Sequence, residues 1–238
     1  MKGVIAGRAP GVPVVDVTHG IPAQDVLAGA LVLRHAVPFF PRGTVHVGIV
    51  DPGVGSERRA LCLETDEGRL VGPDNGLLSL AAPADRVRRA VVLAEERFFL
   101  SPRSRTFHGR DVFAPVAAAL ATGVDPAELG PPCDDPARLV VPPPDVDGTV
   151  VHARVLYVDR FGNLTTNLVD GPLLRRARAI RLGGVRIGGV SPFYAAAPPG
   201  APVAVVNSWG HLEIAVREGS AHERFGAGVG TTIAVEID

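Results

Sequence analysis

Cysteine, lysine and long hydrophobic runs are all scarce in this 238-residue sequence. Its two cysteines, Cys62 and Cys133, are too few and too far apart for a disulfide framework or a cysteine-based metal site. No apolar stretch approaches the ~20 residues that a membrane-spanning helix needs. The formal net charge is −1 and the arginines are scattered, so the basic patch typical of nucleic-acid binding is missing. These absences argue against nucleic acid and membranes as partners.

Metal and cofactor motifs are missing as well. No spacing of His, Asp and Glu matches a zinc or non-haem iron signature, and neither a Walker loop nor a G-x-G-x-x-G turn occurs where it would have to lie. With 46% apolar and 21% charged residues, the composition is that of a globular protein with one large core or two smaller ones. The chain starts without a recognisable signal peptide, so we expect a cytoplasmic protein, and we expect no metal.

The order of the elements predicts two domains. Strands alternate with helical patterns up to about residue 130, which predicts a three-layer, mostly parallel α/β domain over residues 1–140. A proline-rich stretch near 138–148 marks the boundary. Short strands separated by glycine turns follow, and they predict a small antiparallel barrel or sandwich over residues 149–238.

Local patterns place individual elements in the first domain. The expected elements are a helix tail at 1–6, a short strand at 14–17, a helix from Val26 to His35 with Asp25 in its first turn, a strand at 44–50, a hairpin of 60–65 and 69–71, a short helix opened by the turn 72–76, a strand at 87–93, and a helix at 112–121 with Asp111 as N-cap.

The stretch from Val50 to Arg59 has the strongest functional pattern. Asp51 follows an apolar strand, and functional groups in open α/β sheets gather just past the carboxyl ends of such strands. The following prolines and glycines stop the strand and let backbone amides approach a ligand, while Arg58 lies near enough in sequence to fold back over Asp51. The alternative is a capped turn with a surface ion pair, because Asp-Pro-Gly turns are common.

Four further groups carry possible chemistry. His108 precedes a predicted helix and suits a general base, although a structural histidine is the alternative. The turn 72–76 is a second candidate ligand wall. The segment 159–163 combines a carboxylate, an aromatic ring and an amide, which suit a ribose and a stacked base, or else an Asx turn. The segment 207–210 with Glu213 places polar groups between two strands, where Trp209 belongs either to the core or to an interface.

Taken together, these motifs closely resemble the S-adenosyl-L-methionine hydroxide adenosyltransferases, relatives of the fluorinase and chlorinase. The resemblance covers nearly the whole chain in order. It implies an N-terminal α/β domain, a C-terminal β-barrel domain, and a homotrimer that binds substrate between the N-terminal domain of one subunit and the C-terminal domain of its neighbour. The matching segments are 50–55 with Arg58, 72–78, 106–111, 159–163 with Asn167, and 207–208.

The resemblance also implies an activity and a set of site residues. The substrate would be S-adenosyl-L-methionine, hydrolysed to adenosine and L-methionine without a cofactor. The alternatives are a halide transferase that uses the same electrophile and a non-catalytic protein that binds nucleosides or S-adenosyl-L-methionine. The implied residues are Asp51, Arg58 and His108 to ready the water; Asn163, Ser208, Glu213 and the backbone near Val216 to hold adenine; Asp159 and Phe161 to line the site; and Phe107 and Gln24 as further substrate contacts.

One departure from the family pattern concerns the start of the chain. Family members carry, before the segment that matches Met1–Gly3, a first strand ending in Thr-Asp-Phe-Gly, whose aspartate grips the ribose hydroxyls. We expect this strand to be encoded upstream of Met1; otherwise the protein lacks a substrate contact.

Overall fold

Buried apolar side chains fall into two groups that share no residue, one before and one after residue 139. The computed structural model, which describes residues 1–238, accordingly divides into two units, Met1–Leu139 and Val140–Asp238. None of its helices has the length and apolar character that crossing a bilayer requires.

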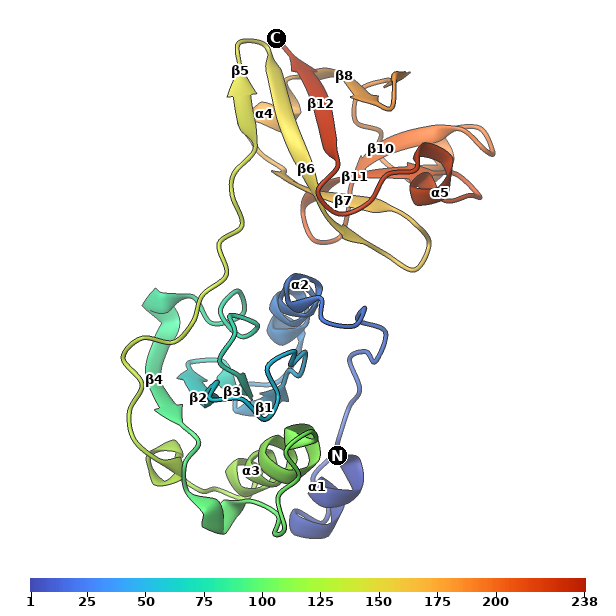
Figure 1. Cartoon of the computed structure of the whole chain (residues 1–238). Coiled ribbons are helices and arrows are strands. Elements are labelled where there is room, and N and C mark those ends of the chain that lie inside the picture. The colour runs from blue at the N-terminus through green and yellow to red at the C-terminus, as the bar shows by residue number, and fades with distance from the viewer. The chain divides into compact units, whose positions relative to one another are not determined.

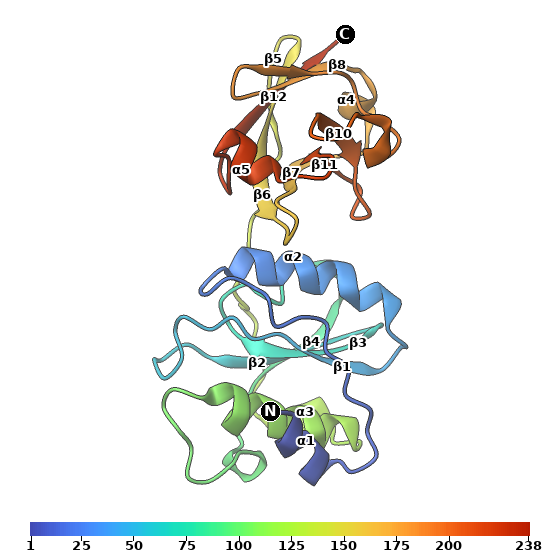
Figure 2. The same ribbon diagram turned by 90° about the vertical axis from the view of Figure 1, so that its right-hand side faces the viewer.

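The N-terminal unit is built on a four-stranded sheet with strand order β1-β3-β2-β4 (Figure 1). Helix α2 lies on one face of this sheet, and α1 and α3 lie on the other (Figure 2). The bounds are α1 Lys2–Arg8, α2 Val26–Ala36, β1 Thr44–Val47, β2 Ala60–Thr65, β3 Gly68–Pro73, β4 Val87–Val92 and α3 Ala114–Ala121, with a π-helical turn at Gly109–Phe113 and 3-10 turns at Val37–Phe39, Ala84–Arg86, Glu96–Phe98 and Pro126–Leu129.

Alternating side chains of β2 explain why both faces of the sheet are covered. Leu61 and Leu63 belong to one buried cluster with Leu33 of α2. Cys62, which points to the opposite face, belongs to another cluster with Phe113 and residues of α3. Successive side chains of a strand point to opposite faces, so a continuous apolar strand needs a helix on each side.

The sheet is mixed, so the mostly parallel arrangement is not confirmed. Only β1 and β3 pair in parallel, whereas β2 pairs antiparallel with both β3 and β4. The hairpin of β2 and β3 is the one that the sequence predicts, and a hairpin pairs antiparallel by construction. The alternation of strands and helices therefore overstates the parallel content.

Helix α2 confirms its prediction, because the Asp25 carboxylate accepts a hydrogen bond from the Ala28 amide and caps the helix. Three other expectations are wrong. The segment 14–17 is no strand, since its three valines are exposed and no neighbouring strand pairs with it. The residues after 72–76 form turns instead of a helix. Asp111 lies inside a helical segment and caps nothing there; its carboxylate accepts from the Ser104 amide and from Arg110.

The C-terminal unit contains an antiparallel sheet that curls into a nearly closed barrel. The strand path is β10-β11-β7-β6-β12-β8-β9, with β5 paired to β6, and a bridge between Ser191 and Val205 brings the chain after β9 beside β10. The bounds are β5 Asp145–Asp147, β6 Val150–Val158, β7 Leu164–Val169, α4 Pro172–Arg175, β8 Ala177–Leu182, β9 Val185–Ile187, a 3-10 turn Tyr194–Ala196, β10 Pro202–Val206, β11 His211–Val216, α5 Ala221–Phe225 and β12 Thr232–Ile237.

Two glycines allow β1 and β3 to end close together. A Cβ atom on Gly72 would lie 2.4 Å from the Gly48 carbonyl oxygen, and one on Gly48 would lie 2.5 Å from a Leu77 methyl. Real Cβ atoms do not approach a backbone oxygen this closely, so position 72 requires glycine, whereas a Cβ on Gly48 would meet only the ends of leucine side chains. The close approach fixes where the chain leaves the sheet, three residues before Asp51.

We predict that Gly72→Ala lowers the free energy of unfolding by about 1–3 kcal/mol, because the added methyl meets a backbone oxygen that can move only with β1. Gly7→Ala in α1 is the matched control: nothing lies within 4 Å of its Cβ position, and alanine favours helix, so this variant should be as stable as the wild type or up to ~1 kcal/mol more stable. Chemical denaturation measures both. Equal stability of the two variants would contradict the packing argument.

Candidate active site

Asp51 and Arg58 form a largely buried, bidentate ion pair just beyond β1. Arg58 Nε donates to Asp51 Oδ1 at 2.8 Å, and Arg58 Nη2 donates to Asp51 Oδ2. The Asp51 side chain is only 7% exposed and the Arg58 side chain only 11%, which excludes the alternative of a surface ion pair. A bidentate pair of this kind fixes the orientation of the carboxylate as well as its position.

The glycine-rich loop between these two residues also contacts the segment that leads to His108. Gly55 has a φ of +79°, and a Cβ on it would lie 2.1 Å from the Arg105 carbonyl oxygen. Only glycine combines this backbone conformation with this approach. The loop therefore packs backbone to backbone against the residues just before His108.

His108 completes the cluster. It immediately precedes the π-helical turn Gly109–Phe113, and its Nδ1 lies 3.1 Å from Arg58 Nη2. A guanidinium only donates hydrogen bonds, so His108 Nδ1 accepts, and the single proton of the neutral ring is on Nε2. Burial lowers the pKa of His108, and the positive charges of Arg58 and Arg103 lower it further. The ring is therefore neutral at pH 7 and presents an N–H donor at Nε2.

Phe113 is a residue of this site that the sequence did not single out. Its ring is fully buried, and the Arg58 guanidinium carbon lies 5.3 Å from the ring centroid. Arg58 Nη1 also donates to the Arg59 carbonyl at 3.1 Å. A cation over an aromatic face is stabilised by the ring quadrupole, so Arg58 is held on several sides. An apolar position in a helix gives no sequence signal for such a role.

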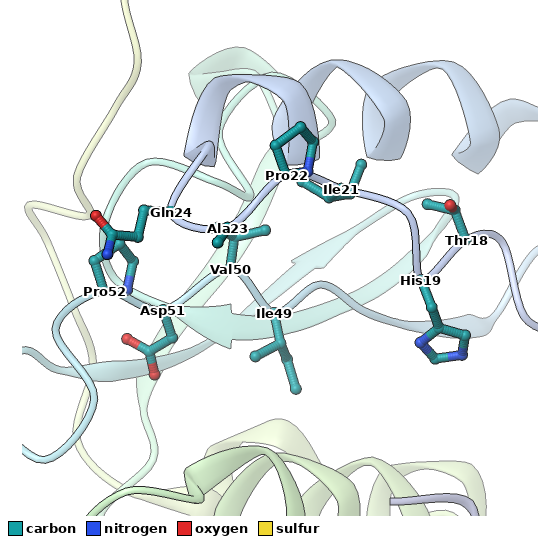
Figure 3. Close-up of a pocket in the computed structure, with 10 residues that line it drawn as sticks. All are labelled: Thr18, His19, Ile21, Pro22, Ala23, Gln24, Ile49, Val50, Asp51 and Pro52. Carbon is teal, nitrogen blue, oxygen red and sulfur yellow. The ribbon is translucent and has the colours of Figure 1, made fainter. Parts of the chain in front are cut away.

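A cavity of about 430 Å³ borders Asp51 (Figure 3). Its walls come from residues 18–24 and from residues 49–52. Gln24 lies on this wall with a φ of +68°, at the third position of a turn in which the Asp25 amide donates to the Pro22 carbonyl at 3.2 Å. That position usually takes glycine or asparagine, so Gln24 is held in an unfavourable conformation beside the cavity. Phe107, in the same unit, is 47% exposed and packs under Arg110.

The predicted residues of the C-terminal unit form a second group. Asp159 Oδ1 accepts from the amides of Phe161 and Asn163, and Asp159 Oδ2 accepts from Asn163 Nδ2 at 3.1 Å. The carboxylate thus makes an Asx turn, as the structural alternative predicted. Phe161 is left 62% exposed, while Asn163 is buried.

Glu213 is buried within β11, and its carboxylate accepts three hydrogen bonds. Its Oε1 accepts from the Tyr194 hydroxyl at 2.8 Å, and its Oε2 accepts from Asn207 Nδ2 at 2.9 Å and from Thr165 Oγ1 at 3.2 Å. Burial raises the pKa of Tyr194, and the hydrogen bond to Glu213 and its charge add to this. Sequence reasoning missed Tyr194, because it lies in an irregular segment whose pattern gives no signal.

The other two predicted residues lie near the ends of β10 and β11. Ser208 is exposed in the turn between these strands. Val216 is buried at the end of β11, and its carbonyl accepts from the Gly219 amide at 3.1 Å. The predicted residues therefore form separate groups in the two units, and in the first unit Arg58 is in direct contact with both Asp51 and His108.

No group of three or more His, Cys, Asp or Glu side chains is placed to hold a metal ion. The chemistry that the first group offers is that of an oriented carboxylate beside a neutral imidazole N–H donor. Such an arrangement can orient a small polar molecule and accept a proton from it.

Comparisons with known proteins identify the family of the chain. The family models "SAM hydroxide adenosyltransferase N-terminal domain" and "SAM hydroxide adenosyltransferase C-terminal domain" match residues 1–130 and 153–234. An (R)-S-adenosyl-L-methionine hydrolase from Thermus thermophilus is 43% identical over 95% of this chain and 89% of its own length. A fluorinase from an Actinoplanes species is 27% identical over 98% of this chain and 91% of its own length.

A solved structure is also similar. The crystal structure of a conserved protein from Thermotoga maritima superposes with a TM-score of 0.89 at 31% identity, over 98% of this chain and 92% of the other chain. The chain belongs to the SAM hydroxide adenosyltransferase family.

Proposed function

We propose that this protein hydrolyses S-adenosyl-L-methionine to adenosine and L-methionine. The observation that carries the proposal is the contact of Asp51, Arg58 and His108 beside a cavity of about 430 Å³. The similarity to a named hydrolase at 43% identity, against 27% for a fluorinase, supports water as the nucleophile.

The reaction needs a positioned water and a proton acceptor but no general acid. Water oxygen attacks the ribose C5′, and the C5′–S bond breaks with its electron pair going to sulfur. The leaving group is a neutral thioether, so it needs no proton. The proton lost by water goes to the Asp51 carboxylate, whose two oxygens each accept one N–H from Arg58 and keep a further acceptor site.

His108 orients the water in this mechanism. A general base was expected at this position, but His108 Nδ1 already accepts from Arg58, and Nε2 carries the proton. The Nε2–H group would donate to a lone pair of the water and leave another lone pair aimed at C5′. Positioning of this kind supplies much of the rate of a bimolecular reaction.

A halide transferase is the weaker alternative. A halide needs no deprotonation, and it would meet the lone pairs of the Asp51 oxygens, which offer it no hydrogen-bond donor. A non-catalytic nucleoside-binding protein would gain nothing from an oriented carboxylate and donor directed at a nucleophile. Neither alternative explains why Arg58 contacts both Asp51 and His108.

The remaining assignments concern substrate binding and assembly. Adenine would be held by Asn163, Ser208, Glu213 and the backbone near Val216; the other substrate contacts would be Asp159, Phe161, Phe107 and Gln24. We propose a homotrimer in which each substrate is shared between the N-terminal unit of one subunit and the C-terminal unit of a neighbour. The proposal rests on the family resemblance.

The first test replaces the proton acceptor. Asp51→Asn should lower adenosine formation by about 10²-fold or more, with a smaller change in KM, because the lost interaction acts mainly in the transition state. Chromatography of the products after incubation with S-adenosyl-L-methionine measures this. Asp66→Asn, at an exposed surface ion pair with Arg88, is the matched control and should be fully active. Normal turnover by Asp51→Asn, or 5′-halo-adenosine formation in halide buffer, would contradict the proposal.

A second test uses the lowered pKa of His108. Protonation places a charge on Nδ1, where Arg58 donates, so kcat/KM should be level at neutral pH and should fall as the pH drops through this lowered pKa. The sulfonium charge of bound substrate should move the corresponding fall in kcat to still lower pH. His108→Gln keeps an N–H donor that does not titrate, so it should lose this acid limb and retain more activity than His108→Ala. Equal inactivity of the two variants would instead support a general base.

The shared site can be tested by complementation. If each site uses two subunits, trimers assembled at random from equal amounts of the Asp51→Asn and Asn163→Ala chains should together recover about one quarter of the wild-type activity, because that fraction of all sites combines an intact N-terminal unit with an intact C-terminal unit. Light scattering checks that the mixed species are trimers. Mixed trimers without recovered activity would show that each subunit works alone.

A further inference from the structure

The turn that follows β3 touches the backbone on both sides of the Asp51–Arg58 pair. Asn75 Nδ2 donates to the Val50 carbonyl at 2.8 Å, and this carbonyl belongs to the peptide bond that joins Val50 to Asp51. The other end of the same amide, Oδ1, accepts from the Leu77 amide at 3.2 Å. The Asn75 side chain therefore links its own turn to the strand exit that carries the carboxylate.

The Val50 carbonyl lies where the sheet has ended. The parallel ladder of β1 and β3 runs to the pair Val47 and Val71, and the Gly48 amide donates to the Val71 carbonyl at 3.0 Å. Beyond this point the chain leaves the sheet. The Asn75 side chain then supplies the N–H donor that a neighbouring strand would otherwise provide. A partly buried carbonyl without such a donor would be destabilising.

The residue before Asn75 makes the equivalent link to Arg58. The Asp74 amide donates to the Arg59 carbonyl at 2.9 Å, and Arg59 Nε donates to Asp74 Oδ2 at 2.7 Å. Arg58 Nη1 donates to the same Arg59 carbonyl at 3.1 Å. Two adjacent residues of one turn thus contact the backbone beside the carboxylate and the backbone beside the guanidinium.

We infer that Asn75 is a positioning residue, which sets the place of the Asp51 carboxylate relative to Arg58 by holding the Val50 carbonyl. The inference builds on the proposed hydrolysis, in which Asp51 accepts the proton of the attacking water. Asn75 acts through the backbone, because its side chain donates to the Val50 carbonyl and to none of the side chains of Asp51, Arg58 and His108, which we call the active group. The turn 72–76, which the sequence offers as a candidate ligand wall, thereby also links two parts of the site. Displacing a catalytic group by about 1 Å can lower the rate by about 10²-fold, so losing the hydrogen bond from Asn75 should measurably lower the rate.

The sharpest variant is Asn75→Asp, which has the same shape. It keeps the acceptor for the Leu77 amide and replaces the donor to Val50 by an oxygen that repels the carbonyl. We expect kcat for adenosine formation to fall by about 10- to 100-fold while KM stays within about threefold. Asn75→Ala, which removes both contacts, should show the same split between kcat and KM and provides a second variant if the first folds poorly.

Ser79→Ala is the matched control. Ser79 Oγ accepts from the Leu139 amide at 2.9 Å and is buried in the same segment, but it contacts neither Val50 nor Arg59. We expect Ser79→Ala to lose thermal stability, as the Asn75 variants do, and to keep the wild-type kcat. Thermal unfolding compares the variants, so a purely structural role of Asn75 would give the same kinetics as the control.

The outcomes separate this inference from the proposed function. Wild-type protein that forms no adenosine would overturn the proposed function. Active wild type together with a folded Asn75→Asp variant of normal kcat would overturn only the role of Asn75. A crystal structure of Asn75→Asp gives a readout that does not depend on activity: we expect the two hydrogen bonds between Arg58 and Asp51 to be broken or lengthened. An unchanged pair there would likewise overturn the inference.

Discussion

The buried ion pair of Asp51 and Arg58 imposes conditions that the surrounding chain has to meet. Removing two charges from water costs several kcal/mol for each ion, by order of magnitude, and the attraction between them offsets this only with good geometry and further hydrogen bonds. Here the ion pair is bidentate. The guanidinium of Arg58 also donates hydrogen bonds to the Arg59 carbonyl and to His108 Nδ1, and the Phe113 ring lies against the face of the guanidinium. The loop glycines, the end of β1 and the helical turn after His108 all help to hold these two side chains in place.

The electrostatic result is a site that carries little net charge. The charges of Asp51 and Arg58 offset each other, and the lowered pKa of His108 keeps its ring neutral. A cationic sulfonium could therefore approach without meeting an unpaired positive charge. The carboxylate still offers oxygen lone pairs to a neutral water molecule. Arg58 thereby acts as a structural counter-charge and as the group that selects the histidine tautomer, two roles that one lysine ammonium would fill poorly, because it lacks the planar fork.

Local sequence patterns predicted the structural features that depend on residues close together in the chain. The cap at Asp25 and the hairpin of β2 and β3 follow from such patterns, and the motif around Asp51 predicts a candidate site. The features that failed depend on distant partners. The valines at 14–17 have strand character but no paired neighbour, and Asp111 closes a loop instead of capping a helix. The sequence predicted that Arg58 folds back over Asp51, which is close to it in the chain. Residue patterns alone did not reveal the contacts between distant residues: Arg58 with His108 Nδ1, Asn75 with the Val50 carbonyl, and Tyr194 with Glu213.

The π-helical turn at Gly109–Phe113 has a further consequence for how this site can vary. A π-helical turn holds one residue more than the α-helical turn it replaces, and each residue rotates a helix by about 100°. If one residue were deleted between His108 and Ala114, a regular α-helix could form, and α3 would keep its packing only if the chain before it rotated. His108 would then leave Arg58, although every residue of the active group would still be present in the sequence. The spacing between the histidine and the helix that follows is thus as much a part of the site as the histidine itself.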